Sequence, residues 1–524
     1  MFETAELAQK IDNKTYKQQV MALRERLLRL QEDLRQSAQT QVILLFAGVD
    51  GGGKGETISI LNEWMDPRWS ITRAYEPPDE HERRYPEFWR YWRDLPPRGR
   101  IGMFLSAWYS QPILDRVYGR TSAHEFDTKL DRILSFETAL AEDGAAIVKF
   151  WMHLSQKAQE RRLKNLEQDP LTAAQVTEND WENWKHYDQF VETAERAISR
   201  THTGKAPWVI VEGEDAHYRS LTVGNAVEDT LVRFQQYPNR PSKAPAGATK
   251  AEKKRQKTRD KQTATLSAKT STVLARLDMN RTLPKVEYRE QLKHLQAKLL
   301  LSQNRARKQG VGTVLVFEGW DAAGKGSVIR RIDAALEAHA YQVHGVAQPT
   351  GEELAQHYLW RFWRHLPRDG HMAIFDRSWY GRVLVERVEG FADEQEWRRA
   401  YAEINDFEDQ LIDHGIILVK YWIHITKDEQ LRRFKLRKRT PHKRWKLNEE
   451  DWRNRKKWED YEIAVHDMVQ YTSTNRAPWT LVEGNDKRCA RIKVLETLCD
   501  RLTQKVGEVS VPTDKEPGIV RIAK

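Results

Sequence analysis

Cysteine is nearly absent from this chain of 524 residues, which contains only Cys489 and Cys499. Two cysteines ten positions apart on one expected helix make a poor disulfide pair and cannot form a zinc framework. The sequence also lacks an apolar run of the roughly 18 residues that a membrane-spanning helix needs. Its first residues show no basic segment followed by an apolar one, so we expect no secretory signal. We therefore expect a cytoplasmic protein with no membrane partner.

The overall charge excludes little by itself. The chain has 86 Lys and Arg against 76 Asp and Glu, a net charge of +10. Such a charge fits a nucleic-acid binder, a protein that binds another polyanion, or neither. Hydrophobic residues make up 40% and charged residues 31%, which excludes a disordered chain and fits two or more domains with large cores.

The chain is an internal duplication with an offset of 271 residues, and the offset holds without a gap from about residue 48 to residue 215. Five matches in one register predict that both halves have the same fold. The matching pairs are Gly48–Gly55 with Gly319–Gly326, Phe88–Pro96 with Leu359–Pro367, Phe104–Tyr109 with Phe375–Tyr380, Lys149–His153 with Lys420–His424, and Ala206–Gly213 with Ala477–Gly484.

A segment of different composition separates the halves. Residues 237–272 are rich in Pro, Ala, Lys, Thr and Ser and include the run KAEKKRQKTRDK. This composition is typical of a solvated linker, while a basic arm that touches a polyanion is the alternative. We therefore expect an N-terminal module at 1–236, a basic flexible linker at 237–272 and a C-terminal module at 273–524.

Short apolar strands alternate with helices in each half, which predicts an α/β fold with a parallel sheet covered by helices on both faces. The strands expected in the second half are Thr313–Glu318, Met372–Asp376, Ile416–His424 and Trp479–Glu483, with counterparts at Val42–Ala47, Gly102–Leu105, Ala145–His153 and Trp208–Glu212. Helices are expected after the first strand of each half, at Ser327–His339 and Glu56–Trp64.

A glycine-rich turn follows the first strand of each half and opens a helix. Such a turn directs backbone N–H groups, a lysine and a helix N-terminus at phosphate oxygens. The usual loop of this kind continues with Ser or Thr after the lysine, and that hydroxyl binds Mg²⁺. Here glycine follows, so an aspartate in the loop is a candidate oxygen ligand instead. The predicted phosphate-binding residues are Gly319, Ala322, Ala323, Gly324, Lys325 and Gly326.

A second candidate element, FDRSWYGR, ends a buried strand of the second half. The carboxyl ends of strands line the ligand crevice in open α/β sheets. Asp376 is placed like the carboxylate that holds Mg²⁺ in P-loop kinases, and Arg377 is placed to stabilise a transferring group. We predict that Asp321 and Asp376 are the metal ligands, directly or through water.

A basic segment, Phe434–Trp458, contains eleven Lys and Arg against three Asp and Glu, a net charge of +8. It lies where kinases carry a helical lid over the phosphates, and Pro441 should divide it into two helices. Its counterpart Leu163–Tyr187 has two Lys and Arg against five Asp and Glu, a net charge of −3. Because one fold accepts either sign, packing does not require the positive charge, which favours binding of a polyanion.

These motifs together resemble the polyphosphate kinase 2 family. The resemblance is carried by EGWDAAGKG (Glu318–Gly326), LWRFWRHLPRDG (Leu359–Gly370), FDRSWYGRVLVERV (Phe375–Val388) and the lid sequence within His424–Tyr461. It covers essentially the whole second half and, more weakly, the first. The two-module form is similar to the subgroup that makes ADP from AMP and polyphosphate.

The resemblance implies two tandem P-loop kinase-like modules, each with a helical lid, and specific site residues. It assigns catalysis to Asp321, Lys325, Asp376 and Arg377. The expected polyphosphate-binding residues of the lid are Arg433, Arg437, Lys443, Arg444, Lys446 and Arg455.

The first half departs from the family pattern at several of these positions, so we expect it to be non-catalytic. Leu105, Ser106, Ala47 and Gln111 stand for Asp376, Arg377, Glu318 and Arg382, and Thr172, Ala173 and Gln175 stand for Lys443, Arg444 and Lys446.

The expected reaction is transfer of the terminal phosphoryl group of inorganic polyphosphate to AMP, with Mg²⁺ as cofactor. The alternatives are a polyphosphate-dependent kinase of nucleoside diphosphates, an ATP-dependent nucleotide kinase and a polyanion-binding protein without catalysis. No nucleic-acid partner is expected, and a homo-oligomer is compatible with the sequence.

Overall fold

The computed structural model describes residues 1–170, 172–236, 272–441 and 449–511. These residues form two compact units. The first contains residues 1–79, 90–236 and 349–360, and the second contains residues 80–89, 272–348 and 361–511. Each unit thus includes a short segment from the other half of the sequence. Residues 237–271 of the expected linker lie outside the described residues.

Each unit contains a five-stranded sheet in which all pairs are parallel, as predicted. The strand orders are β2-β3-β1-β4-β5 and β7-β8-β6-β9-β10, so the two sheets have the same topology. The strands are β1 Val42–Gly48, β2 Ser70–Ala74, β3 Ile101–Leu105, β4 Ala146–His153, β5 Trp208–Glu212, β6 Thr313–Gly319, β7 Tyr341–Gly345, β8 Met372–Asp376, β9 Ile417–His424 and β10 Trp479–Glu483.

The edge strands β2 and β7 were not predicted. Their residues are half-buried or exposed throughout, whereas those of β4 and β9 are buried at every position. An edge strand of this kind carries no continuous apolar run, so the hydrophobic pattern gave no signal for it.

The longer helices of the first half of the sequence are α1 Asn13–Ser37, α2 Lys54–Trp64, α5 Ala123–Glu142, α6 Gln156–Gln168, α8 Tyr187–Thr201 and α9 Ala216–Gln236, with the shorter α3 Trp89–Asp94, α4 Ser110–Val117 and α7 Glu178–Lys185. Those of the second half are α11 Lys285–Lys308, α12 Lys325–Asp333, α16 Glu394–Asp413, α17 Lys427–Arg439, α19 Trp458–Thr472 and α20 Lys487–Val506, with the shorter α13 Gly351–Leu354, α14 Trp360–Trp363, α15 Val385–Glu389 and α18 Glu449–Lys456. The helix expected to reach His339 ends at Asp333.

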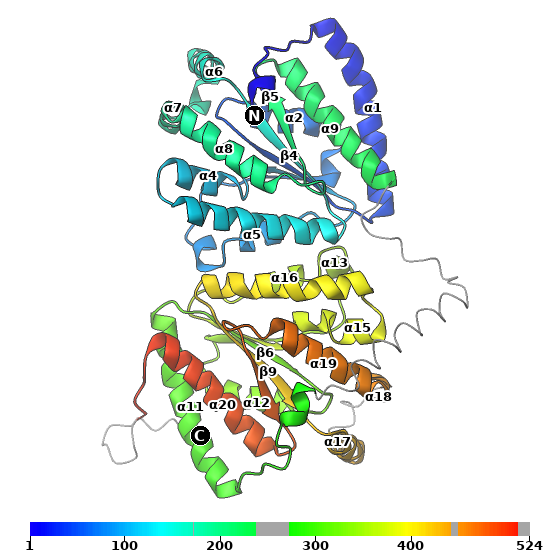
Figure 1. Cartoon of the computed structure of the whole chain (residues 1–524), viewed down its shortest axis with the longest axis vertical. Coiled ribbons are helices and arrows are strands. Elements are labelled where there is room, and N and C mark those ends of the chain that lie inside the picture. Colours follow the sequence, from blue (N-terminus) through cyan, green and yellow to red (C-terminus); the bar gives the residue numbers. More distant parts are fainter. Residues whose placement is uncertain (171, 237–271, 442–448, 512–524) are drawn as a thin grey trace, which may run out of the picture. The chain divides into compact units, whose positions relative to one another are not determined.

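Helices cover both faces of each sheet (Figure 1). In the first unit α1, α2 and α9 pack on one face and bury a core with β1, β3, β4 and β5, while α5 lies against β4 on the other. In the second unit α12 and α20 contact the sheet on one side, and α16 packs against β9 on the other. This double cover explains why the central strands are continuous apolar runs.

A buried lysine occurs at the same position in both units and anchors the segment that follows β8 in the second unit and β3 in the first. Nζ of Lys420 donates to Glu408 at 2.7 Å, to the hydroxyl of Tyr380 at 2.9 Å and to the carbonyl oxygen of Thr472 at 2.7 Å. Lys149 makes the same three bonds to Glu137, Tyr109 and Thr201 in the first unit. Buried charges of this kind are tolerated because each one is paired and hydrogen-bonded.

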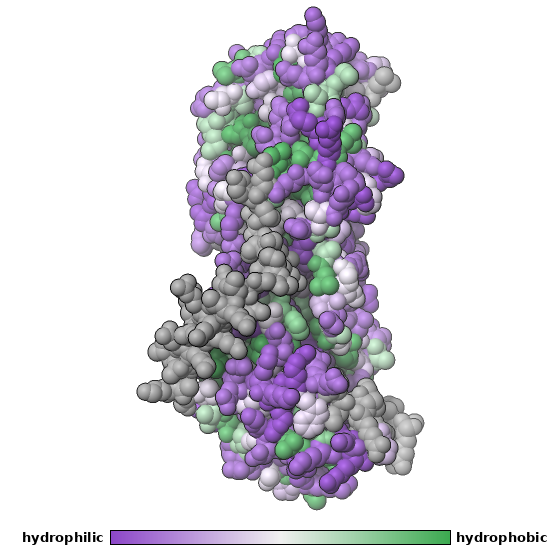
Figure 2. Space-filling model, turned by 90° about the vertical axis from the view of Figure 1, so that its right-hand side faces the viewer, coloured by the Kyte–Doolittle hydropathy of each residue, from purple (hydrophilic) through white to green (hydrophobic). Residues whose placement is uncertain are grey.

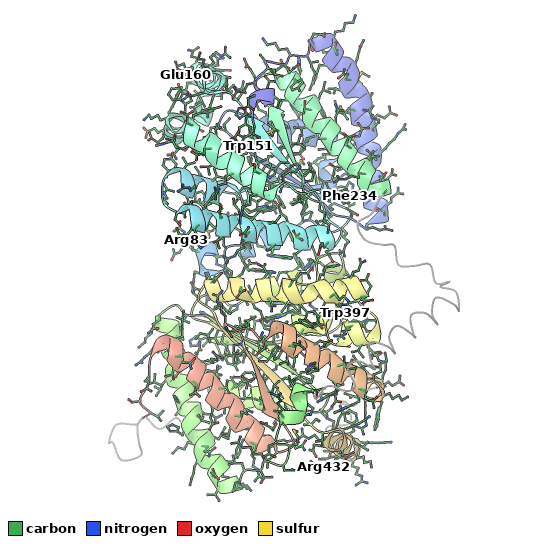
Figure 3. The ribbon with its side chains drawn as sticks, viewed as in Figure 1. Arg83, Trp151, Glu160, Phe234, Trp397 and Arg432 are labelled. Atoms are coloured by element: carbon green, nitrogen blue, oxygen red, sulfur yellow. The ribbon has the colours of Figure 1, made fainter. Side chains whose placement is uncertain are left out.

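The surface carries the charge that the composition predicts. Figure 2 shows hydrophilic side chains over most of the face that it presents. In Figure 3, Glu160 on α6 and Arg432 on α17 lie on outer helices, whereas Trp151 of β4 lies inside the first unit. Within the described part of the chain, no helix is both long and apolar enough to cross a membrane.

Candidate active site

The phosphate loop of the second unit runs from Gly319, the last residue of β6, to Lys325, the first of α12. At Gly319 φ is +149° and a Cβ would lie 2.5 Å from the carbonyl oxygen of Ile423, so only glycine fits here. Lys325 folds over the loop, and its Nζ donates to the carbonyl oxygen of Gly319 at 2.8 Å. The loop thus places an ammonium group beside the first N–H groups of α12, which have no acceptor within the helix.

Arg433 supports this loop from beneath. Its NH1 group donates to the carbonyl oxygens of Ala322 at 2.9 Å and Ala323 at 2.7 Å. Its NH2 group donates to those of Gly484 at 2.6 Å and Asn485 at 3.0 Å, and the side chain is 3% exposed. The structure therefore places Arg433 behind the loop and not on its open side. These bonds favour a supporting role for Arg433 over the predicted contact with polyphosphate.

One predicted phosphate-binding residue has a partner inside the loop itself. The N–H of Ala323 donates to the carbonyl oxygen of Trp320 at 2.9 Å, which leaves it no hydrogen for a phosphate. The other predicted residues lie together on the loop and the first turn of α12 and remain predictions: Gly319, Ala322, Gly324, Lys325 and Gly326.

Asp376 ends β8 directly beside the loop. The parallel pairing of β8 with β6 sets Asp376 opposite Phe317, two residues before the loop begins. Its Oδ2 lies 3.9 Å from the position that a Cβ on Gly326 would take. Gly326 occupies the place where other phosphate loops carry the magnesium-binding Ser or Thr. The fold therefore supplies a carboxylate close to the position of the missing hydroxyl.

Arg377 and Asp321 meet across the loop. An NH2 nitrogen of Arg377 lies 3.4 Å from Oδ1 of Asp321, while Asn454 donates from Nδ2 to Oδ2 of the same carboxylate at 2.9 Å. Because Asn454 belongs to α18, this hydrogen bond ties the lid to the loop. Arg377 has a φ of +66°, a conformation that non-glycine residues rarely adopt and that is typical of functional sites.

Glu318 is a buried carboxylate at the base of the loop. It is 5% exposed, and its Oε1 accepts a hydrogen bond from the hydroxyl of Ser378 at 2.8 Å. Burial raises the pKa of Glu318 to about 7, against the opposing effect of the positive charges of Lys325 and Arg377.

Carboxylates outnumber cations around this cavity, which has a volume of about 70 Å³. Glu318, Asp321 and Glu450 line it together with Lys325 and Arg377, and Asp376 adds a fourth carboxylate beside the loop. No group of three or more His, Cys, Asp or Glu side chains among the described residues is arranged to hold a metal ion. A phosphate entering this site would meet excess negative charge, which a cation shared with the phosphate would relieve.

The basic lid is described only in part. Arg437 lies on α17, which ends at Arg439, and the next helix among the described residues begins at Glu449, so Pro441 lies between two lid helices. Arg455 on α18 donates to the carbonyl oxygen of Lys427 at 2.5 Å and to Oε1 of Gln430 at 3.2 Å, which links the two lid helices. Three of the residues predicted to bind polyphosphate lie outside the described residues: Lys443, Arg444 and Lys446.

The first unit repeats the loop without the groups that surround it in the second. Lys54 donates to the carbonyl oxygens of Gly48 at 2.8 Å and Val49 at 2.9 Å, and Asn183 donates to Asp50 at 2.8 Å. The positions of Asp376, Arg377 and Glu318 are held by apolar or uncharged residues, namely Leu105, Ser106 and Ala47.

Comparison with known proteins identifies the family to which these two units belong. A family model described as polyphosphate kinase 2 matches residues 10–238 and again residues 282–509. The chain belongs to the polyphosphate kinase 2 family. The resemblance in the sequence is thereby confirmed, and each module is a polyphosphate kinase 2 unit.

Several members of the polyphosphate kinase 2 family match over nearly the full length. A polyphosphate:AMP phosphotransferase of Pseudomonas aeruginosa is 48% identical over 504 residues, which cover 96% of this chain and 98% of that protein. One from Pseudomonas syringae pv. tomato is 46% identical over 506 residues, with the same shares covered. A crystal structure from Pseudomonas aeruginosa PA01, of a chain assigned to polyphosphate kinase 2, has a TM-score of 0.84 at 45% identity and covers 96% of this chain and 99% of that one.

Three residues that the structure places in or beside the site were not predicted as site residues: Asn454, Gln430 and Glu318. For the first two the duplication carried a usable signal, because Asn454 and Gln430 recur as Asn183 and Gln159 at the same offset of 271 residues. Glu318 was noted only as a difference from Ala47, and its burial beside Lys325 could not be read from the sequence.

The raised pKa of Glu318 predicts that the free energy of unfolding depends on pH. Its pKa is about 7 in the folded protein against an ordinary value of 4.5, so between these pH values the folded state holds a proton that the unfolded state has lost. The free energy of unfolding should therefore fall by about 3 kcal/mol as pH rises through this window. Glu318→Gln should remove that part of the decline, measured by urea unfolding at a series of pH values. Equal slopes for the wild type and the variant would contradict the prediction.

Proposed function

We propose that this chain transfers the terminal phosphoryl group of inorganic polyphosphate to AMP, giving ADP, and that its second unit performs the transfer. The observation that carries the proposal is the set of charged groups around the second loop. Asp376 and Arg377 flank that loop, whereas Leu105 and Ser106 stand at the equivalent positions beside the loop of the first unit. The two full-length relatives, both polyphosphate:AMP phosphotransferases, support this choice of donor and acceptor.

The side chains around the second loop fit a divalent cation, and we propose Mg²⁺. Four carboxylates against two cations leave an excess of negative charge beside a phosphate loop. Asp376, next to Gly326, and Asp321 would hold the ion together with phosphate oxygens and water, since Mg²⁺ is usually bound through one or two carboxylates. Bound there, the ion would neutralise charge on the phosphates that react.

The protein's own contribution is positioning and charge. Lys325 and the N–H groups that open α12 hold phosphate oxygens, and the bonds from Arg433 to the loop carbonyls keep this cradle rigid. Arg377, steadied by Asp321, stabilises the negative charge of the group in transfer. The phosphate oxygen of AMP is already anionic, so no strong general base is needed.

The lid would hold the long donor. A net charge of +8 over Phe434–Trp458 is more than one triphosphate requires, which favours polyphosphate over ATP. We assign this role to Arg437, Lys443, Arg444 and Lys446. Arg455, also predicted to bind polyphosphate, supports the lid by linking α18 to α17. Action in the cytoplasm without a nucleic-acid partner is part of the same proposal.

A donor assay tests the function. The protein is incubated with AMP, Mg²⁺ and either polyphosphate or ATP, and ADP is measured. We expect ADP with polyphosphate in the absence of ATP. ADP formed only with ATP would identify an ATP-dependent nucleotide kinase, and no ADP with either donor would leave a polyanion-binding protein. Replacing AMP by ADP tests the remaining alternative, a kinase of nucleoside diphosphates.

The inequality of the two units predicts unequal effects of one substitution. Lys325→Ala or Asp376→Asn should lower kcat by about 10²–10³, because each removes a charge that acts on the transferring group. Lys54→Ala removes the matched side chain from the first loop and should retain at least about tenfold more kcat than Lys325→Ala. Comparable losses in the two lysine variants would refute the assignment of catalysis to the second unit.

The lid assignment predicts a loss that is specific to the donor. Lys443→Ala combined with Lys446→Ala should raise KM for polyphosphate by about tenfold or more, since two charged contacts are lost, with a much smaller effect on KM for AMP. The KM of the wild type for polyphosphate should also rise steeply with salt. The matched control is Lys164→Ala with Lys185→Ala in the first unit, where both lysines pair with glutamates on their own helices. Equal changes in both KM values would contradict a donor role for the lid.

A further inference from the structure

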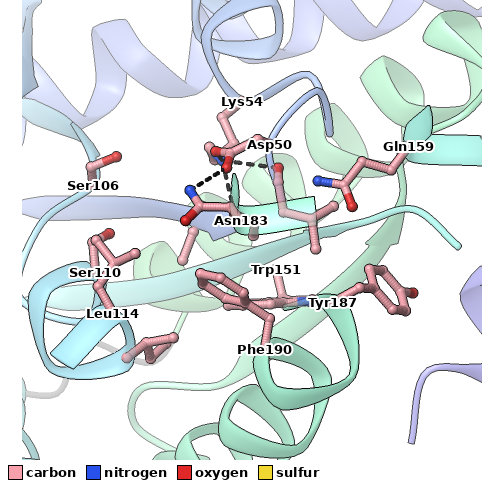
Figure 4. Close-up of a pocket in the computed structure, with 14 residues that line it drawn as sticks. Asp50, Lys54, Ser106, Ser110, Leu114, Trp151, Gln159, Asn183, Tyr187 and Phe190 are labelled. Carbon is pink, nitrogen blue, oxygen red and sulfur yellow. Dashed lines mark hydrogen bonds and ion pairs between the residues drawn. The ribbon is translucent and has the colours of Figure 1, made fainter. Parts of the chain in front are cut away.

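The first unit keeps a pocket over its phosphate loop (Figure 4). Its volume is about 110 Å³, against about 70 Å³ for the cavity of the second unit. The two cavities are lined at equivalent positions, offset by 271 residues, including the loop lysine, the loop aspartate and the lid asparagine. A phosphate pocket that is no longer used would tend to be filled by larger side chains, because cavities are destabilising. The pocket of the first unit is instead the larger of the two.

The enlargement has identifiable causes. In the second unit Trp320 stacks on Trp458 with ring centroids 3.6 Å apart, which fills the apolar side of the site. Val49 holds the equivalent position to Trp320 in the first unit and leaves part of that space open. Figure 4 shows Trp151, Phe190 and Tyr187 along the side of the pocket opposite Lys54 and Asp50. The pocket thus has a phosphate-binding end and an aromatic end.

Two buried polar groups that line this pocket have no partner among the described residues. Oε1 of Gln159 and Nε1 of Trp151 make no hydrogen bond, although each side chain is only 3% exposed. In Figure 4 the amide of Gln159 points into the pocket toward Asp50 and Lys54. Burying such groups without a partner costs about 1–3 kcal/mol each, so a ligand that supplies partners would be favoured.

The second unit shows how this amide became unpaired. There, Oε1 of Gln430 accepts a hydrogen bond from Arg455 at 3.2 Å. Trp184 stands at the position of Arg455 in the first unit and donates to the carbonyl oxygen of Gln156 at 3.1 Å, which leaves the amide of Gln159 without that donor. The vacant acceptor therefore results from a specific exchange between the lids.

The charges of this pocket suit a small monoanionic or dianionic phosphate. Of the residues that line it, only Asp50 and Lys54 are charged, and Asn183 also donates to Asp50 at 2.8 Å. No excess of carboxylates demands a divalent cation, in contrast to the second unit. The lid segment Leu163–Tyr187 carries a net charge of −3, which would repel a long polyanion.

We propose that the pocket of the first unit binds a nucleoside monophosphate without turning it over. The phosphate lies on the loop at Lys54, and the nucleoside occupies the end lined by Trp151 and Phe190, within reach of the acceptor on Gln159 and the donor on Trp151. The site cannot transfer a phosphoryl group, because it has neither the carboxylate nor the arginine that Leu105 and Ser106 replace.

Binding stoichiometry tests this proposal on the full chain. Equilibrium dialysis with labelled AMP, in the absence of polyphosphate, should give one more AMP per chain for the wild type than for Lys54→Ala. The matched variant Lys325→Ala should retain the site that Lys54→Ala removes. An unchanged stoichiometry in Lys54→Ala would overturn the proposal, and so would loss of the same site in Lys325→Ala.

A second variant guards against a loss of folding in Lys54→Ala. Oε1 of Gln159 has no hydrogen-bond partner among the described residues, so the fold should tolerate Gln159→Leu. It should weaken AMP binding at this site about fivefold, the effect of one hydrogen bond. Unchanged affinity would show that Gln159 does not face the ligand and would overturn the proposed pose.

Ribose 5-phosphate separates a nucleotide site from a simple phosphate site. It carries the same phosphate without the base, so it should bind at this site about tenfold more weakly than AMP if the aromatic end is used. Equal affinity of the two compounds, or of inorganic phosphate and AMP, would overturn the assignment to a nucleoside monophosphate.

Discussion

The close approach of two strands sets the position of every group around the phosphate loop. At Gly319 a side chain would collide with the backbone of β9, 2.5 Å from the oxygen of Ile423. At Gly48 the same collision, at 2.2 Å, involves the oxygen of Met152. Each loop must therefore begin where its strand leaves the sheet, and the parallel register then brings the end of β8 or β3 beside it. Steric exclusion at one glycine thus fixes the geometry that charge and chemistry use.

The two units share the residues that hold the loop in place but carry different charges around it, so they can differ in function while sharing a fold. The buried lysine, the loop lysine and the pair of asparagine with aspartate are present in both. The side chains that line the cavity differ. The first unit has Ala47 and Ser106 at the positions where the second has Glu318 and Arg377. The same backbone thus accepts a charged or an uncharged side chain at these positions. The residues that line the two cavities thus differ although the frame around them is shared.

The sequence was sufficient for the parts of the fold that repeat or bury apolar runs. The central strands, the loops and the divided lid were predicted and are present. The edge strands β2 and β7 were not predicted, because their half-buried and exposed residues lack the apolar pattern of a central strand. Arg433 was expected to bind polyphosphate as part of the lid, since charge counts do not reveal which way a side chain on α17 points. Its place under the loop depends on hydrogen bonds to the loop and to Gly484, which follows β10, and such contacts are a tertiary property.

Ser106 has a φ of +52°, close to the +66° of Arg377, although it has no guanidinium to aim. The left-handed turn is therefore a property of the strand and loop geometry and not of the arginine that uses it. Such a conformation costs about 1–3 kcal/mol, and the surrounding sheet imposes it in both units. The first unit thus keeps the backbone conformation of this turn without the aspartate and arginine side chains of the second. The difference between the two sites at this turn therefore lies in the side chains and not in the backbone.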